Sequence, residues 1–103
     1  MAIQCDIQQD NNVVSMLVRG NLDAQSAGGL REQLKAMASE AAGRRIVVDL
    51  SKVPFMDSTG LAALISDLKI VRQNQGDMAL TGVTPEVMRI FQITLLDRAF
   101  TFI

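Results

Sequence analysis

This sequence lacks histidine, tryptophan and tyrosine altogether, and it holds a single cysteine, Cys5. Without histidine, the chain has no imidazole to act as a general base and no zinc site with a histidine ligand. One cysteine excludes an internal disulfide and a cluster of thiolate ligands. We therefore expect no metal and no cofactor, and we expect Cys5, on an alternating apolar segment, to be a buried and unreactive thiol.

The chain also lacks an excess of charge of either sign. Ten lysines and arginines stand against eleven aspartates and glutamates, which gives a net charge of -1. Such a surface has no basic field to attract nucleic acid or anionic lipid, so we expect neither nucleic acid nor membrane as a partner. No apolar run approaches the ~20 residues that cross a bilayer, and the first residues lack the regions of a signal peptide. These absences predict a cytoplasmic location.

What the chain does have is the ordinary composition of a globular domain. It contains 103 residues, of which 49% are apolar and 20% are charged. A chain of this length and composition buries a core of its own. No repeat, linker or low-complexity segment divides it, so we expect a single domain over residues 1–103.

Hydrophobic spacing predicts an α/β fold. Alternation over residues 3–7 and a mostly apolar run over residues 13–18, separated by turn residues, predict a hairpin of two strands. Beyond it, the spacing indicates helices over residues 30–41, 61–71 and 85–91 and strands over residues 46–50, 77–81 and 100–103. This order predicts a mixed sheet of four to five strands covered by helices. The nearly continuous apolar run at 46–50 is typical of a central strand covered on both faces.

The most informative segment is 56–61, which reads Met-Asp-Ser-Thr-Gly-Leu. It follows the strand at 46–50 and opens a helix, whose unpaired N–H groups favour an anion. Asp57 or Ser58 would cap that helix, and Gly60 would leave room for an approaching group. Taken by itself, the segment is most simply a helix cap. A cap needs only one polar residue, however, and does not require the whole run.

Four groups of residues follow one another along nearly the whole chain. They are Gly20-Asn21-Leu22-Asp23, Val48-Asp49-Leu50-Ser51, Met56-Asp57-Ser58-Thr59-Gly60-Leu61, and Gly82, Pro85 and Phe91 with Leu96-Asp97-Arg98-Ala99-Phe100. In this order they resemble the STAS domain of the anti-sigma factor antagonist (anti-anti-sigma factor) family, which implies the STAS fold. Two positions depart from the family pattern: Leu95 stands where many members have glycine, and Gln75-Gly76 stands where a glycine pair is common.

The resemblance implies a regulatory phosphoprotein and not an enzyme. In the family, the serine after the motif aspartate is phosphorylated, which corresponds to Ser58, with Thr59 as the alternative acceptor. The unmodified domain binds an anti-sigma factor, usually also a serine-protein kinase, and thereby releases the target of that factor. Phosphorylation ends the binding, and a PP2C-type phosphatase restores it. The resemblance thus predicts partner switching in signal transduction and transcription regulation.

The expected partner-binding residues lie in the motif and beside it: Asp23, Phe55, Asp57, Ser58, Thr59, Gly60 and Leu61. Asp23 could equally cap the helix at 30–41, as could Ser26, while the resemblance places its loop beside the phosphorylated serine. Phe55 could present an apolar contact to a partner. Val53 and Met56, on either side of it, are expected in the core.

Other functions compete with this interpretation. A STAS domain that is not phosphorylated could be a scaffold in a signalling complex or a soluble subunit of a lipid-transport system. A hydrolase with Ser58 as nucleophile would need a lysine or carboxylate base, and neither Lys52 nor Lys69 has a position that supports this role. No glycine-rich phosphate loop with a lysine is present, so nucleotide binding is not predicted.

Overall fold

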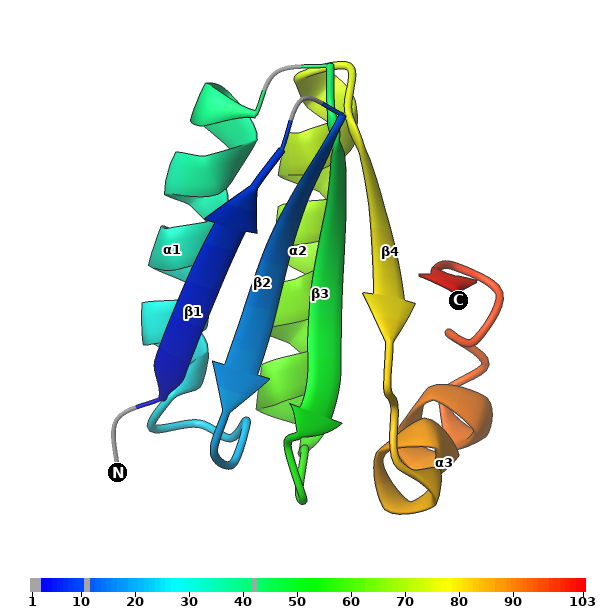
Figure 1. Cartoon of the computed structure of the whole chain (residues 1–103). Helices are drawn as coiled ribbons and strands as arrows, with labels where there is room; N and C mark the ends of the chain where they lie inside the picture. The colour runs from blue at the N-terminus through cyan, green and yellow to red at the C-terminus, as the bar shows by residue number, and fades with distance from the viewer. Residues whose placement is uncertain (1–2, 11, 42) are drawn as a thin grey trace.

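The computed structural model describes residues 3–10, 12–41 and 43–103. Within these ranges, strands and helices alternate after an initial strand pair, as predicted (Figure 1). In chain order they are β1 Gln4–Gln9, β2 Val13–Arg19, α1 Ala27–Glu40, β3 Arg45–Lys52, α2 Ser58–Gln73, β4 Asp77–Thr81, α3 Pro85–Ile93 and β5 Thr101–Phe102.

The strands form one mixed sheet in the order β1-β2-β3-β4-β5. β1 and β2 are antiparallel, which confirms the hairpin, and β2 to β5 run parallel. The hairpin turns at Asp10, whose Oδ1 atom accepts hydrogen bonds from the N–H groups of Asn12 and Val13, at 2.9 and 2.7 Å. Because one helix joins each parallel strand to the next, the carboxyl ends of β2, β3 and β4 meet at one end of the sheet (Figure 1).

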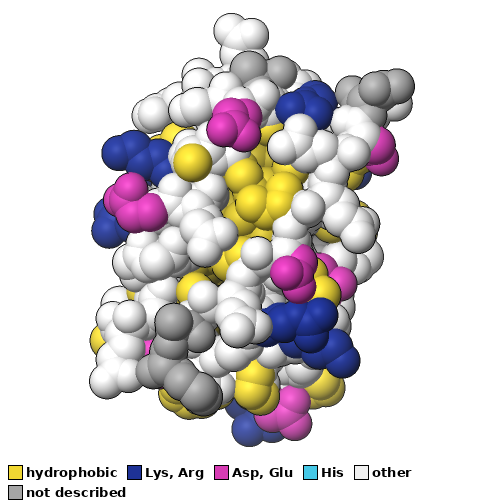
Figure 2. Space-filling model, turned by 60° about the vertical axis from the view of Figure 1, so that its left-hand side comes forward, with side chains coloured by type: hydrophobic (Ala, Val, Ile, Leu, Met, Phe, Trp, Pro, Cys, Tyr) yellow, Lys and Arg dark blue, Asp and Glu magenta, His cyan; other side chains and the backbone are white. Residues whose placement is uncertain are grey.

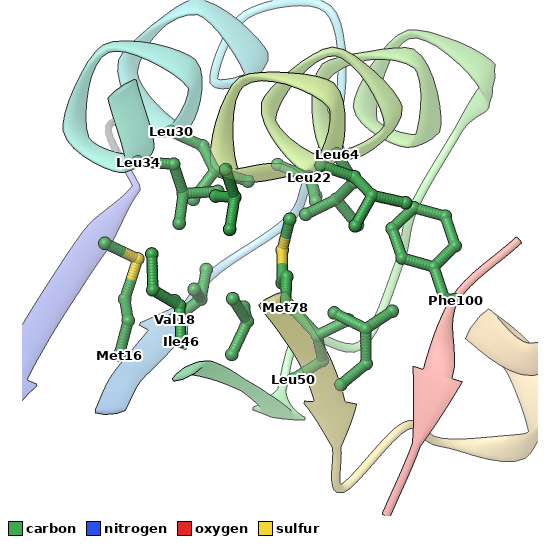
Figure 3. Packing of buried hydrophobic residues seen from close by; sticks show 14 of the residues in the cluster. Met16, Val18, Leu22, Leu30, Leu34, Ile46, Leu50, Leu64, Met78 and Phe100 are labelled. Carbon is green, nitrogen blue, oxygen red and sulfur yellow. The ribbon is translucent and has the colours of Figure 1, made fainter. Parts of the chain in front are cut away.

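Helices α1 and α2 pack side by side against the inner face of the sheet, and α3 lies past the end of β4 (Figure 1). The core fills the space between the sheet and these two helices. Figure 3 shows Met16, Ile46 and Met78 of the sheet facing Leu34 and Leu64 of the helices, and all five side chains are buried. The apolar spacing that predicted each helix therefore identifies its inner face.

The outer face of the sheet is not covered by α1, α2 or α3 (Figure 1). Along β3, the buried residues Ile46, Val48 and Leu50 accordingly alternate with the half-buried Val47 and Asp49. The expectation that this strand is covered on both faces was therefore wrong. Val47 lengthens the apolar run because β-branched residues suit a partly exposed strand as well as a buried one.

Two helices end in a residue other than glycine with a left-handed backbone. Gln75 follows α2 with a φ of 64°, and Leu95 follows α3 with a φ of 60°. At the end of α3, the N–H of Leu96 donates to the carbonyl of Phe91 at 2.9 Å. This hydrogen bond defines the Schellman helix end, which favours glycine because a side chain is strained at positive φ. The two departures from the family pattern thus coincide with the two strained positions.

Replacing Leu95 by glycine should stabilise the fold. A left-handed backbone costs an L-residue ~1–2 kcal/mol, and the Leu95 side chain is 79% exposed, so its loss forfeits little burial. After allowing for the greater freedom of glycine in the unfolded chain, we expect Leu95→Gly to raise the free energy of unfolding by about 0.5–1 kcal/mol. Urea denaturation followed by circular dichroism measures this change.

The matched control for this substitution is Gln92→Gly. Gln92 is an exposed residue within α3, where glycine should cost about 1 kcal/mol. Opposite signs for the two glycine variants would locate the strain at Leu95. A loss of stability in Leu95→Gly as large as that in Gln92→Gly would contradict this account of the helix end.

Candidate functional site

The 56–61 motif lies at the carboxyl end of the sheet, where the loop after β3 meets the loop after β2. Two backbone hydrogen bonds join the loops: Leu22 N–H donates to the Phe55 carbonyl at 2.9 Å, and Asp57 N–H donates to the Leu22 carbonyl at 3.1 Å. They continue the parallel pairing of the strands through an isolated bridge between Leu22 and Met56. The Gly-Asn-Leu-Asp turn and the motif therefore form one continuous surface.

Asp57 is the cap of α2. Its backbone is extended, and its Oδ1 atom accepts a hydrogen bond from the N–H of Gly60 at 3.0 Å. Ser58 is consequently the first residue of the helix and not its cap, which decides between the two candidates. Ser58 and Thr59 are both exposed. The Ser58 hydroxyl thus faces solvent at the end of a helix whose partial positive charge favours an anion.

Gly60 allows close contact between α2 and the loop after β2. A Cβ atom at this position would clash with the carbonyl oxygen of Leu22 and lie 2.8 Å from its Cγ atom. The glycine therefore serves an internal contact, and the expectation that it leaves room for an approaching group was wrong. Leu61, next in the chain, is 2% exposed and belongs to the core. Gly60 and Leu61 hold the motif in place from beneath its exposed surface.

Asp23 is held in the turn before α1. Its Oδ1 atom accepts hydrogen bonds from the N–H groups of Gln25 and Ser26, at 3.0 and 3.2 Å. Ser26 stands at the N-cap position of α1 without making a capping bond, and its hydroxyl donates to the Asn21 carbonyl at 2.6 Å. Asp23 therefore shapes the turn, and it remains half-buried directly after the bridge residue Leu22.

An apolar side chain and a groove flank the exposed hydroxyls. Phe55 is 51% exposed, whereas Val53 and Met56 are buried, as predicted. The groove, with a volume of about 200 Å³, lies between the first turns of α1 and α2. Thr59 lines it together with Arg31 and the small residues Ala24, Ala27, Gly28, Ala62 and Ala63. The site thus combines hydroxyls, an aromatic ring and a shallow groove on one end of the molecule.

Asp67, a buried carboxyl group on α2, is not among the residues predicted from the sequence. Its side chain is 0% exposed, and neither of its oxygens has a hydrogen-bond partner among the described residues. Burial raises the pKa of Asp67 to about 7. The positive charge of Arg31 lowers this pKa in part, and the negative charge of Glu32 raises it. Asp67 lies roughly two and a half helical turns from Ser58.

Other candidate chemistry is limited in the described part of the chain. Cys5 was expected to be buried, but it is only half-buried. Its partial burial raises the pKa of the thiol, and the negative charge of Asp6 raises that pKa further. Residues 3–10, 12–41 and 43–103 hold no group of three or more cysteine or carboxylate side chains placed to bind a metal ion. Among the same residues, no helix has the length and apolar character that crossing a membrane requires.

A hairpin followed by parallel strands, helices on one face and an exposed serine at the start of the second helix define an α/β domain of the STAS type. The STAS domain family model matches residues 4–103, and the chain belongs to this family.

Two similar proteins are both described as antagonists of an anti-sigma factor. The anti-sigma-B factor antagonist of Bacillus subtilis is 35% identical over 94 residues, which cover 91% of this chain and 84% of that protein. A structure of an anti-sigma factor antagonist from Mycobacterium paratuberculosis has a TM-score of 0.84 and 25% identity, covering 97% and 84% of the two chains.

The anti-sigma factor antagonist SpoIIAA of Bacillus shares the fold in two forms. Its unphosphorylated form has a TM-score of 0.79 and 19% identity, covering 97% of this chain and 88% of that one. Its phosphorylated form has a TM-score of 0.71 and 18% identity, covering 97% and 91%. The predicted STAS fold is therefore confirmed.

Proposed function

We propose that this protein is an anti-sigma factor antagonist that switches partners through phosphorylation of Ser58. In its unmodified form it binds an anti-sigma factor that is also a serine kinase, and the target of that factor is released. The kinase then phosphorylates Ser58, and the complex dissociates. The observation that carries this proposal is the exposed Ser58 hydroxyl at the first position of α2, directly after the capping residue Asp57.

Helix α2 is suited to carry a phosphate without unfolding. Phosphorylation adds a charge of about -1.5 to -2 at neutral pH, and the helix N-terminus stabilises negative charge. Asp57 supplies its cap through Gly60 and does not depend on the Ser58 hydroxyl. The phosphate should therefore leave the domain folded and change only how its surface meets a partner.

The partner would lose affinity because it must cover two negative groups. The surface that we assign to partner binding consists of the exposed Phe55, Ser58 and Thr59 and the half-buried Asp23 and Asp57, with Gly60 and Leu61 supporting it from within. Burying a phosphate beside the Asp57 carboxylate costs several kcal/mol unless both are fully paired. Each 1.4 kcal/mol is a tenfold change in affinity, so release needs no conformational change in this domain.

Ser58 is the proposed acceptor and Thr59 the alternative. Both are exposed, but Ser58 directly follows the cap, as in the family motif, while Thr59 lines the groove between α1 and α2. A PP2C-type phosphatase would remove the phosphate and reset the switch. On this proposal the domain is a cytoplasmic binding module and kinase substrate, and it performs no chemistry itself.

Phosphorylation by the cognate kinase tests this function. We expect the protein, incubated with its anti-sigma factor kinase and ATP, to gain one phosphate, which peptide mass spectrometry should place on Ser58. Ser58→Ala should gain none, and Thr59→Ala should be modified as the unaltered protein is. If the kinase forms a complex with this protein yet leaves it unmodified, the result would contradict the phosphorylation switch and favour a role as a scaffold or as a subunit of a transport system. A phosphate on Thr59 alone would reassign the acceptor.

A further inference from the structure

Among residues 3–10, 12–41 and 43–103, one row of backbone groups on the first strand has no partner. Among the described residues, β1 pairs only with β2 and forms one edge of the sheet. At the turn, the N–H of Asp10 donates to the carbonyl of Val13 at 3.0 Å. Antiparallel bonds alternate along the ladder, so the even-numbered residues of β1 bond to β2 and the odd-numbered ones face the open edge. These open-edge residues are Cys5, Ile7 and Gln9.

The side chains of these open-edge residues lie on the inner face of the sheet. Cys5 is opposite the buried Val18, and Ile7 is opposite the buried Met16. Helix α1 does not fully cover this edge, since Ile7 is 43% exposed and Cys5 is half-buried. Figure 2 views the side of the molecule formed by β1 and α1, where hydrophobic side chains gather in a hollow. An added strand would cover both the backbone groups and this apolar surface.

β1 lacks most of the features that protect edge strands from pairing. Proteins commonly blunt such edges with lysine, proline, a bulge or a very short strand. β1 is six residues long, contains no lysine or proline, and pairs with β2 without a register shift. Its one charged residue, Asp6, points to the outer face and lies 3.1 Å from Arg19. The edge is therefore open to another strand of the same alternating pattern, which β1 itself supplies.

We propose that two copies of this protein dimerise by antiparallel pairing of their β1 edges, with Ile7 opposite Ile7 of the second copy. A register centred on Asp6 would place two like charges opposite each other, which destabilises a strand pair. The register centred on Ile7 instead places Asp6 opposite Gln8, whose amide can donate to the carboxylate. A register centred on Cys5 would leave Gln9 without a partner.

This dimer would leave both copies of the functional site free. The two-fold axis makes the contact isologous, so each copy uses the same strand. Because the strands run antiparallel, the two Ser58 surfaces would lie at opposite ends of the joined sheet. The dimer would then present two independent sites, and the inference stands whether or not Ser58 is phosphorylated.

Sedimentation velocity from micromolar to millimolar concentration tests the dimer. We expect the unaltered protein to convert reversibly from monomer to dimer. Ile7→Lys should remain monomeric at concentrations where the unaltered protein is mostly dimer, because it would place two lysines opposite each other. The matched control Ile93→Lys alters an exposed residue on α3 and should dimerise normally. Circular dichroism establishes that both variants are folded.

Two results would overturn the proposal: the unaltered protein remaining monomeric throughout, or folded Ile7→Lys dimerising equally well. Amide hydrogen exchange by NMR tests the register separately. Exchange at the open-edge residues Cys5, Ile7 and Gln9 should slow as concentration rises. Exchange at Gln4, Asp6 and Gln8 should not change, because these groups already bond to β2.

Discussion

Ser58→Asp should fold normally and bind the anti-sigma factor at least about 100-fold more weakly than the unaltered protein. The aspartate places a charge at an exposed position beside Asp57, and the proposed interface would bury both carboxylates. The corresponding penalty of about 3 kcal/mol is within the range for imperfectly paired ions. Isothermal titration calorimetry with the purified anti-sigma factor measures the affinity, and circular dichroism checks the fold.

Two further variants serve as controls for Ser58→Asp: one removes the Ser58 hydroxyl without adding a charge, and the other adds the charge at a distant position. Ser58→Ala should bind as the unmodified protein does and should stay bound in the presence of ATP. Ser39→Asp adds the same charge at an exposed residue near the far end of α1, and it should bind within about twofold of the unaltered protein because surface charges distant from an interface are largely screened. Undiminished binding by Ser58→Asp would contradict the proposed mechanism.

The second large effect is expected at Asp67, where Asp67→Asn should stabilise the protein at neutral and alkaline pH. The carboxyl group is buried and has no hydrogen-bond partner among the described residues, so its charged form is costly. The pKa is raised to about 7 in the folded protein, against about 3.9 for an ordinary aspartate. Between these values the folded state keeps a proton that the unfolded chain has released. Stability therefore falls as pH rises, and the loss is complete above about pH 7.

The pH dependence of the stability difference between Asp67→Asn and the unaltered protein sets the sign and size of the expected effect. Asparagine does not titrate, so the stability advantage of Asp67→Asn should be small near pH 4. It should grow by about 1.4 kcal/mol per pH unit up to a ceiling of about 4 kcal/mol near pH 7. Urea denaturation at several pH values measures it, with Glu40→Gln, an exposed carboxyl on α1, as the control. An advantage that stays constant or shrinks with rising pH would contradict the assigned pKa.

Much of the fold was predictable because each element carries its own local signal. Leu30, Leu34 and Met37 mark the inner face of α1 by spacing alone, and all three are buried. The open outer face was not predictable in this way. Val47 makes the β3 sequence look continuous, yet whether a helix covers that residue depends on which face the crossover helices take, and strand composition does not determine this.

The sequence motif located the candidate site, but it did not predict the contacts within that site. The pairing of Leu22 with Phe55 and Asp57 joins two loops that are distant in sequence, so no local pattern reports it. The same contact explains Gly60, whose missing side chain makes room for Leu22. For Asp67 a signal was available: the residue lies three positions after Leu64 and four before Val71, which places it on the apolar face of α2.

The most direct test of the switch uses phosphate itself. The protein should be phosphorylated stoichiometrically at Ser58, and its affinity for the anti-sigma factor compared by calorimetry with that of the unmodified protein. We predict that the phosphorylated form loses binding at least about 100-fold with an unchanged circular dichroism spectrum, and that a PP2C-type phosphatase restores binding. Equal affinity of the two forms would contradict the proposed function.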